Sequence, residues 1–306
     1  MEYSFKTAED VLRITSEKKI PISEVAKLYE AERSGKTVAE VRTKMKETRN
    51  VMYDAVKRGV KTTETSKMGM VGGDAYKMYA QLEHMKDMMG NRFTVRAQAY
   101  ALAMNEQNAC MGRIVAFPTA GGSGVIPGTL FSASEEFRAG KRRLLNGMFC
   151  ASAIGLIIAE GATLSAAKGG CQAEVGAAVA MAAAGLTEMR GGTPEQCFHA
   201  SAIGLKSYLG LACDPLGGLV EVPCIKRNAI GCMAAIGASD MSIAGVKSFI
   251  PFDEVVEAMA NIARIMSPKL RETALGGLAV TKTGNMIKRK LGLPVVEDII
   301  ANLNKK

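Results

Sequence analysis

The stretch Val175-Gly-Ala-Ala-Val-Ala-Met-Ala-Ala-Ala-Gly-Leu186 carries no charged side chain, and it favours a helical core. It is shorter than the roughly 20 apolar residues that cross a bilayer, so it predicts a buried helix. Met148–Ala159 is a second run of this kind. With 32 glycines and 19 methionines among 306 residues, the chain supplies small and adaptable side chains that suit closely packed helices. This length allows one large domain or two.

Capping signals and amphipathic patterns predict further helices on the N-terminal side of this centre. Ser23 and Glu24 are placed to begin a helix after Pro21. Thr37-Val-Ala-Glu40 has the spacing of a capping box, in which the Thr oxygen accepts a backbone N–H and the Glu carboxylate reaches back. Residues 60–75 are rich in Thr, Ser and Gly, which compete with helix formation. They predict a loop that serves as a connector or as a lid.

The C-terminal half shows similar signals for the starts and ends of helices. Thr193-Pro-Glu-Gln196 predicts a helix start, and that helix is expected to end at Gly210. Asp253–Ile265 predicts another helix, ended by Ser267-Pro268. The only alternating segments, residues 113–117 and 220–222, are too short to build a sheet.

The sequence therefore predicts an all-α protein. Residues 1–70 form an N-terminal amphipathic helical region, and residues 71–306 form a larger helical domain that contains every cysteine. One continuous domain is the alternative.

The net charge of +9 does not indicate a nucleic-acid binder. Acidic residues alternate with basic ones, and the cluster Lys141-Arg142-Arg143 has no aromatic neighbours. An anionic substrate or an acidic protein partner suits such a surface equally well. Seven cysteines without a signal peptide predict a reducing cytoplasm.

Three cysteines, Cys171, Cys213 and Cys224, each lie beside a break in local structure. Cys171 and Cys224 precede helical runs, where the positive end of the helix dipole favours a thiolate and lowers its pKa, and Cys213 lies in a Pro/Gly loop. Three thiolates fit an iron–sulfur cluster that keeps one iron open for catalysis. The separations of 42 and 11 residues form no Cys-x-x-Cys motif, so the ligands must converge through tertiary structure.

The alternative is that all seven are ordinary buried cysteines. Four of them fit that description from their local sequence: Cys110, Cys150, Cys197 and Cys232. Zinc is disfavoured because only His84 and His199 are available to complement the thiolates, and neither has ligand spacing to a cysteine.

Around these cysteines the chain resembles the α chain of iron–sulfur-dependent L-serine dehydratase (L-serine ammonia-lyase), in its bacterial two-chain form. The matching stretches are Met104–Gly112, Phe117–Gly128, Gly169–Gly176, Gly191–Gln196, Leu209–Asn228 and Arg271–Ala279. The resemblance implies a [4Fe–4S] cluster held by Cys171, Cys213 and Cys224 in an all-helical unit, and a separate β chain supplied in trans. It also implies amino-acid catabolism that feeds gluconeogenesis. The tail Ala301–Lys306 has no cysteine, so the occupation of the fourth iron by a C-terminal cysteine, as in some single-chain relatives, is not expected.

The implied reaction converts L-serine to pyruvate and ammonium without pyridoxal phosphate. An open iron would act as a Lewis acid toward the β-hydroxyl, and a base must remove the Cα proton. Lys168, Glu174 and Lys226 are the candidate bases near the cysteines, and Glu221 lies nearby. Each of them is equally placed to be a structural ion-pair partner, and another cysteine or a group from the β chain is a further alternative for the base.

The loop Pro118-Thr-Ala-Gly-Gly-Ser-Gly124 predicts substrate binding. Backbone N–H groups around Gly121 and Gly122 form a nest for the serine carboxylate, and the hydroxyls of Thr119 and Ser123 add donors. A plain tight turn is the alternative. Arg227 and Asn228 are expected to orient substrate or to cover the cluster.

Two other functions remain open at this point. An L-cysteine desulfidase would eliminate sulfide in place of water at the same kind of iron. A non-catalytic iron–sulfur subunit would bind the cluster and turn over nothing.

Overall fold

The computed structural model describes residues 1–295, and this part of the chain contains helices and no β-strand. The helices are α1 (Ala8–Lys18), α2 (Ile22–Ser34), α3 (Val38–Gly59), α4 (Asp74–Ala80), α5 (Arg92–Ala109), α6 (Val125–Glu136), α7 (Lys141–Gly161), α8 (Ala166–Gly169), α9 (Ala177–Met189), α10 (Pro194–Lys206), α11 (Cys224–Ile243), α12 (Phe252–Ile265) and α13 (Lys282–Lys290). The all-α prediction is confirmed. The cysteine-free tail Ala301–Lys306 lies outside the described residues.

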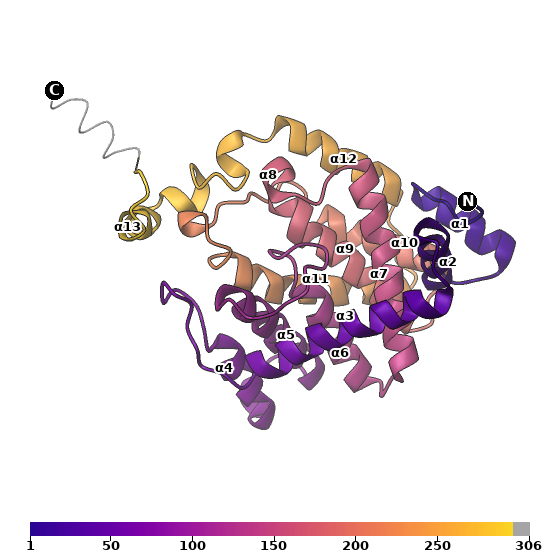
Figure 1. Ribbon diagram of the computed structural model, residues 1–306, viewed down its shortest axis with the longest axis horizontal. Coiled ribbons are helices and arrows are strands. Elements are labelled where there is room, and N and C mark those ends of the chain that lie inside the picture. The colour runs from indigo at the N-terminus through magenta and orange to yellow at the C-terminus, as the bar shows by residue number, and fades with distance from the viewer. Residues whose placement is uncertain (296–306) are drawn as a thin grey trace.

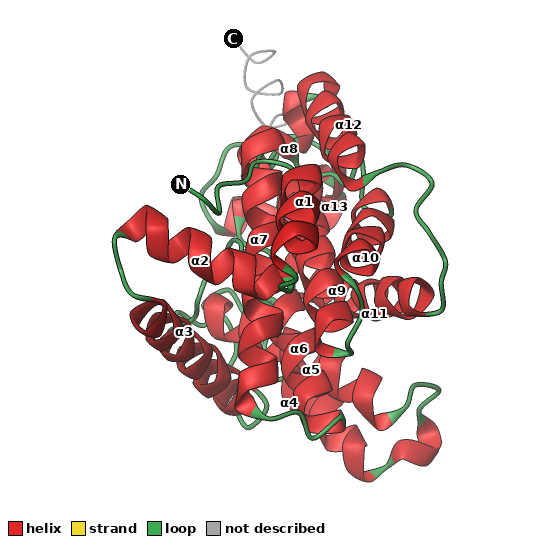
Figure 2. Cartoon of the chain, turned by 90° about the vertical axis from the view of Figure 1, so that its right-hand side faces the viewer, coloured by secondary structure: helices red, strands yellow, loops and turns green. Residues whose placement is uncertain are grey.

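The predicted apolar helix, α9, occupies the centre of the bundle, where α6, α7, α10 and α11 pack around it (Figures 1 and 2). Small side chains make this close packing possible. A Cβ atom on Gly185 would lie 2.5 Å from the carbonyl oxygen of Gly147 on α7, so the two backbones approach to a distance that only glycine permits.

Helix α7 extends well beyond the apolar run Met148–Ala159, because it begins at the exposed basic residues Lys141-Arg142-Arg143. Within the described residues it is the one helix whose length and composition would allow it to cross a membrane. Most of its apolar window is buried, and it packs against α9 and α2. Those contacts are the ones expected of a core helix.

The N-terminal helices contribute to the same hydrophobic core. The buried side chains form one connected cluster, whose members range in sequence from Phe5 to Met259. The capping box of Thr37 and Glu40 forms as predicted at the start of α3. Pro21 takes the N-cap position of α2, so Ser23 lies inside the first turn and donates its N–H to Glu188 of α9 at 3.0 Å.

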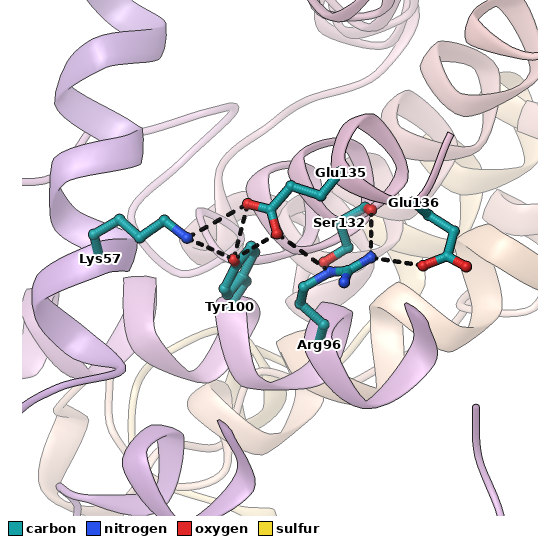
Figure 3. A network of polar contacts seen from close by, with 6 residues as sticks. All are labelled: Lys57, Arg96, Tyr100, Ser132, Glu135 and Glu136. Atoms are coloured by element: carbon teal, nitrogen blue, oxygen red, sulfur yellow. Dashed lines mark hydrogen bonds and ion pairs between the residues drawn. The ribbon is translucent and has the colours of Figure 1, made fainter. Parts of the chain in front are cut away.

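A network of polar contacts ties α3 to α5 and α6 (Figure 3). Lys57 donates to the hydroxyl of buried Tyr100 at 2.8 Å, and that hydroxyl donates to Glu135 at 2.9 Å. Arg96 pairs with Glu136 at 2.9 Å. Burial raises the pKa of Tyr100, and the neighbouring Glu135 adds to the effect. The tyrosine therefore remains a neutral donor that bridges the lysine and the carboxylate.

Helix boundaries in the C-terminal half follow the sequence signals closely. The capping box of Thr193 and Gln196 starts α10, and α12 spans Phe252–Ile265. Helix α10 ends at Lys206, short of the predicted Gly210, because the chain first makes a turn and Gly210 takes a left-handed conformation with φ of 80°. Residues 61–73 form the predicted loop before α4.

Candidate functional site

Two of the three predicted cysteines come together in the interior with a glutamate, and the third lies near them. The sulfur atoms of Cys171 and Cys213 and a carboxylate oxygen of Glu174 all lie within 4.8 Å of one another. Cys224 interacts electrostatically with both: its charge raises the pKa of Cys213, and the charge of Cys171 raises the pKa of Cys224. All three thiols are buried and free. The other four cysteines do not belong to this cluster; they lie on α7, α10 and α11 and at the end of α5: Cys150, Cys197, Cys232 and Cys110.

Cys171 is held at the entrance to a π-helical turn, Gln172–Gly176, which leads into α9. Such turns are frequent at functional sites. The buried Gln172 side chain donates to the carbonyl of Met259 at 3.2 Å and accepts the N–H of Gly210 at 2.9 Å. Gly170, with φ of 73°, packs closely against the carbonyl of Leu211. These contacts bind the Cys171 segment to α12 and to the loop that carries Cys213.

Cys213 lies in the loop between α10 and α11, as predicted, and its backbone is held by a distant segment. Its N–H donates to the carbonyl of Leu270, and its carbonyl accepts the N–H of Glu272, both at 2.9 Å. This is the isolated β-bridge between Cys213 and Arg271. The middle cysteine is therefore placed by residues almost sixty positions further along the chain.

Cys224 is the first residue of α11 and follows a cis Val222–Pro223 bond. Its carbonyl accepts from the Asn228 amide at 2.9 Å. The same amide donates to the carbonyl of Gly121 at 2.6 Å, and the Asn228 oxygen accepts the N–H of Gly124 at 3.0 Å. Asn228 thus connects the third cysteine to the loop 118–124.

The pKa values of the three thiols are shifted in different directions. The pKa of Cys171 is lowered, mainly because the Cys213 thiol donates a hydrogen bond to it, and Arg227 contributes to the effect. The pKa of Cys213 is raised strongly by the same bond and by burial. Burial raises the pKa of Cys224 to about 12. The predicted lowering of its pKa by a helix N-terminus is therefore wrong for Cys224, because desolvation outweighs the helix dipole.

The loop 118–124 lies directly against Glu174. A Cβ atom on Gly121 would lie 2.3 Å from a Glu174 carboxylate oxygen, and one on Gly122 would lie 2.7 Å from the Glu174 carbonyl. The Thr119 hydroxyl accepts the N–H of Gly122 at 3.2 Å and is hydrogen-bonded to the Glu174 carboxylate. Ser123 is fully buried, and its hydroxyl donates to the carbonyl of Ala120 at 2.8 Å. Its hydroxyl therefore stabilises the loop from within.

The candidate bases occupy different environments. Glu174 is buried beside the thiols, and burial raises the pKa of its carboxyl while the Thr119 hydrogen bond opposes that shift. Lys226 is half-exposed and forms an ion pair with Asp74 at 2.6 Å. Lys168 is exposed at the end of α8. Of the three, the structure places Glu174 with the cysteines and the loop.

Two residues that shape the site, Asp214 and Ser66, are not among those predicted from the sequence. Asp214 lies next to Cys213 and pairs with Arg227. Ser66, in the loop before α4, donates to Glu221 at 2.6 Å, three residues before Cys224. This contact brings part of the predicted connector or lid beside the start of α11. The adjacent sequence positions of Asp214 and Cys213 were the only available signal.

Comparison with known proteins gives a consistent result. Residues 17–279 match the family described as serine dehydratase alpha chain. The probable L-serine dehydratase, alpha chain, of Bacillus subtilis (strain 168) is 46% identical over 94% of this chain and 95% of the relative. The L-serine dehydratase, alpha chain, of Peptoniphilus asaccharolyticus is 41% identical over 92% and 97%. L-serine dehydratase TdcG of Escherichia coli (strain K12) is 34% identical over 91% of this chain, but this covers 62% of the relative.

Proposed function

We propose that this chain, which belongs to the serine dehydratase α-chain family, is the α chain of an L-serine ammonia-lyase. Its reaction is the dehydration and deamination of L-serine to pyruvate and ammonium. The observation that carries the proposal is the convergence of Cys171, Cys213 and Glu174 against the glycine loop 118–124. A site of three thiols, one buried carboxyl and a nest of backbone amides has the parts that this elimination requires.

The donor set fits an iron–sulfur cluster. Thiolates are the usual ligands of such clusters, and the described part of the chain places no histidine with these three cysteines. We assign Cys171, Cys213 and Cys224 as the residues that hold a [4Fe–4S] cluster. When bound, a cluster with three protein ligands supplies a Lewis acid for the β-hydroxyl of serine, a task for which the chain needs no pyridoxal phosphate.

The loop 118–124 binds the carboxylate of serine in this proposal. The N–H groups of Gly122, Ser123 and Gly124 are already bonded to Thr119, Ala120 and Asn228. The N–H groups of Thr119, Ala120 and Gly121 make no hydrogen bond within residues 1–295, so they are the donors left for the substrate. Asn228 and Ser123 act indirectly, by fixing the shape of the loop.

Glu174 is the base that we assign to the Cα proton. Its carboxylate lies between the thiols and Gly121, next to the donors that orient the substrate. A raised pKa brings a carboxyl closer to the working pH of a base. The alternatives are Lys168 and Lys226. In the holoenzyme, Glu174→Gln should lose pyruvate formation while it keeps its iron, whereas Lys168→Met and Lys226→Met should keep both. Full activity of Glu174→Gln would reassign the base.

A β chain completes the enzyme in this proposal. The relatives named alpha chain match this chain along almost their whole length, whereas TdcG extends well beyond it. We place the protein in the reducing cytoplasm, in line with seven free cysteines.

The function is tested by reconstituting the chain anaerobically with iron, sulfide and its β chain, and by measuring pyruvate release from serine and from cysteine. Turnover of serine over cysteine supports the proposal. Preference for cysteine would indicate a desulfidase. No turnover despite a full cluster would indicate a non-catalytic iron–sulfur subunit.

A further inference from the structure

We infer that Arg227 and Asp214 form a charge clamp that holds the three cysteines in register and stabilises the bound cluster. The inference rests on the proposed function, because it concerns the same cysteines. Both are positioning residues: they act on the cysteines and have no assigned contact with serine.

Arg227 reaches all three cysteine segments at once. It lies in the first turn of α11, the helix that Cys224 begins. Its guanidinium donates to the carbonyl of Ala212 at 2.8 Å and to Asp214 at 3.0 Å, the residues on either side of Cys213. It also lies close enough to Cys171 for the guanidinium charge to act on that thiol. One side chain on α11 therefore spans the loop of the second cysteine and the thiol of the first.

Asp214 extends this arrangement to a fourth segment. Its side chain is 7% exposed, so its charge is desolvated and depends on Arg227 for compensation. Its second oxygen accepts the N–H of Leu278 at 2.8 Å. Gly277, at φ of 57°, lies so close that an added Cβ would be 2.4 Å from that oxygen. The carboxylate thus fixes residues 277–278 against the cysteine loop.

The planar fork of arginine explains why this position needs more than a positive charge. The Ala212 carbonyl and the Asp214 carboxylate match the forked donors of a guanidinium, whereas a lysine ammonium offers a compact point charge on a flexible stem. A cluster with three thiolates carries net negative charge, which the guanidinium offsets. Hydrogen bonds to sulfur and nearby charge also set the reduction potential of such clusters. Removal of Arg227 should therefore lower the potential and make the cluster easier to oxidise.

The test uses Arg227→Gln, Arg227→Lys and Asp214→Asn in the full chain with its β chain, reconstituted anaerobically. Arg190→Gln is the matched control, because Arg190 pairs with Asp240 at 2.6 Å near the other end of α11, away from the cysteines. The readouts are iron and sulfide per chain, the rate at which visible absorbance is lost in air, and the potential from a spectroscopic redox titration. Far-UV circular dichroism of the iron-free proteins checks the fold.

We expect Arg227→Gln to lose absorbance in air about tenfold faster than the wild type, the order of effect of one lost charge-assisted hydrogen bond. Its potential should fall, Arg227→Lys should be intermediate, and Arg190→Gln should match the wild type. Equal bleaching rates and potentials for Arg227→Gln and wild type would overturn this inference but would leave the proposed function unaffected. If Arg227→Gln fails to fold, a wild-type bleaching rate and potential in Arg227→Lys would overturn it. A wild type that binds no iron would contradict the proposed function itself.

Discussion

The substitution Asn228→Ala tests whether Asn228 positions the loop 118–124 for serine binding or only stabilises the fold. The Asn228 side chain makes hydrogen bonds to Gly121, Gly124 and Cys224, and it is fully buried. Alanine leaves the N–H of Gly124 and the carbonyl of Gly121 without these partners. The loop 118–124 then loses its connection to α11, and the amides proposed to bind serine lose their fixed direction.

The magnitude follows from the number of buried groups left unsatisfied. Each buried donor or acceptor without a partner costs about 1–3 kcal/mol. Two such groups, with partial relaxation, lower the free energy of unfolding by about 2–4 kcal/mol. A chain of 306 residues has an unfolding entropy of about 0.6 kcal/mol/K, so the Tm should fall by about 3–6 °C. A displaced nest should also reduce kcat/KM for serine by about 100-fold, the cost of misplacing the substrate.

The assay measures the Tm of the chain by circular dichroism, and kcat and KM for serine in the reconstituted enzyme. Ser201→Ala is the control, because the fully buried Ser201 hydroxyl donates to Ala180 at 3.0 Å away from the loop 118–124. It should cost about 1 kcal/mol and leave the kinetics unchanged. If Asn228→Ala loses stability but keeps kcat/KM within about twofold, the loop does not need Asn228 to bind serine, and the reasoning is refuted.

Three further outcomes are expected. Alanine at Cys171, Cys213 or Cys224 should abolish iron binding after reconstitution, whereas alanine at Cys110, Cys150, Cys197 or Cys232 should leave iron per chain unchanged; normal loading of any of the first three would contradict the ligand assignment. Gly121→Ala should reduce activity more than tenfold, because its Cβ would meet Glu174 at 2.3 Å, whereas Gly237→Ala on α11, with open space around it, should be active; activity in Gly121→Ala would show that the loop yields. Burial raises the pKa of Glu188 in the folded state, so its carboxyl weakens the fold as pH rises through that pKa. Glu188→Gln should therefore have the higher Tm at about pH 8, with the difference vanishing near pH 4, and a gap independent of pH would exclude this cause.

The sequence predicts the local features of this protein well. The capping boxes at Thr37 and Thr193 place two helix starts, because each signal is complete within four residues. The end of α10 is predicted less well. The turn after this helix depends on a hydrogen bond from the N–H of Gly210 to the Gln172 side chain. That contact joins positions 38 residues apart, and no local pattern encodes it.

In the candidate site, too, local features are predicted from the sequence, whereas features that depend on tertiary contacts are not. Cys171, Cys213 and Cys224 stand out because each lies beside a break in local structure, and the glycines of the loop 118–124 stand out as a cluster. The sequence singles out Arg227 as a residue that orients substrate or covers the cluster, but it does not predict that Arg227 joins the cysteine segments. That role depends on which carbonyl and which carboxylate lie within reach of its side chain. The protonation of Cys224 is not visible either, because burial is a property of the folded chain.

The three cysteines are held in place by different kinds of structure, and this affects how the site forms. Cys171 and Cys224 belong to helical segments that pack in the core. The backbone of Cys213 instead donates its N–H to Leu270 and accepts the N–H of Glu272, and Arg227 donates to the neighbouring residues Ala212 and Asp214. The position of Cys213 thus depends on tertiary contacts alone. Because ligands that converge only in the folded state turn metal-binding energy into folding energy, a bound cluster would stabilise this loop more than the helical core. The Arg227–Asp214 pair stabilises that least locally determined of the three ligands, which is where a clamp has the most effect.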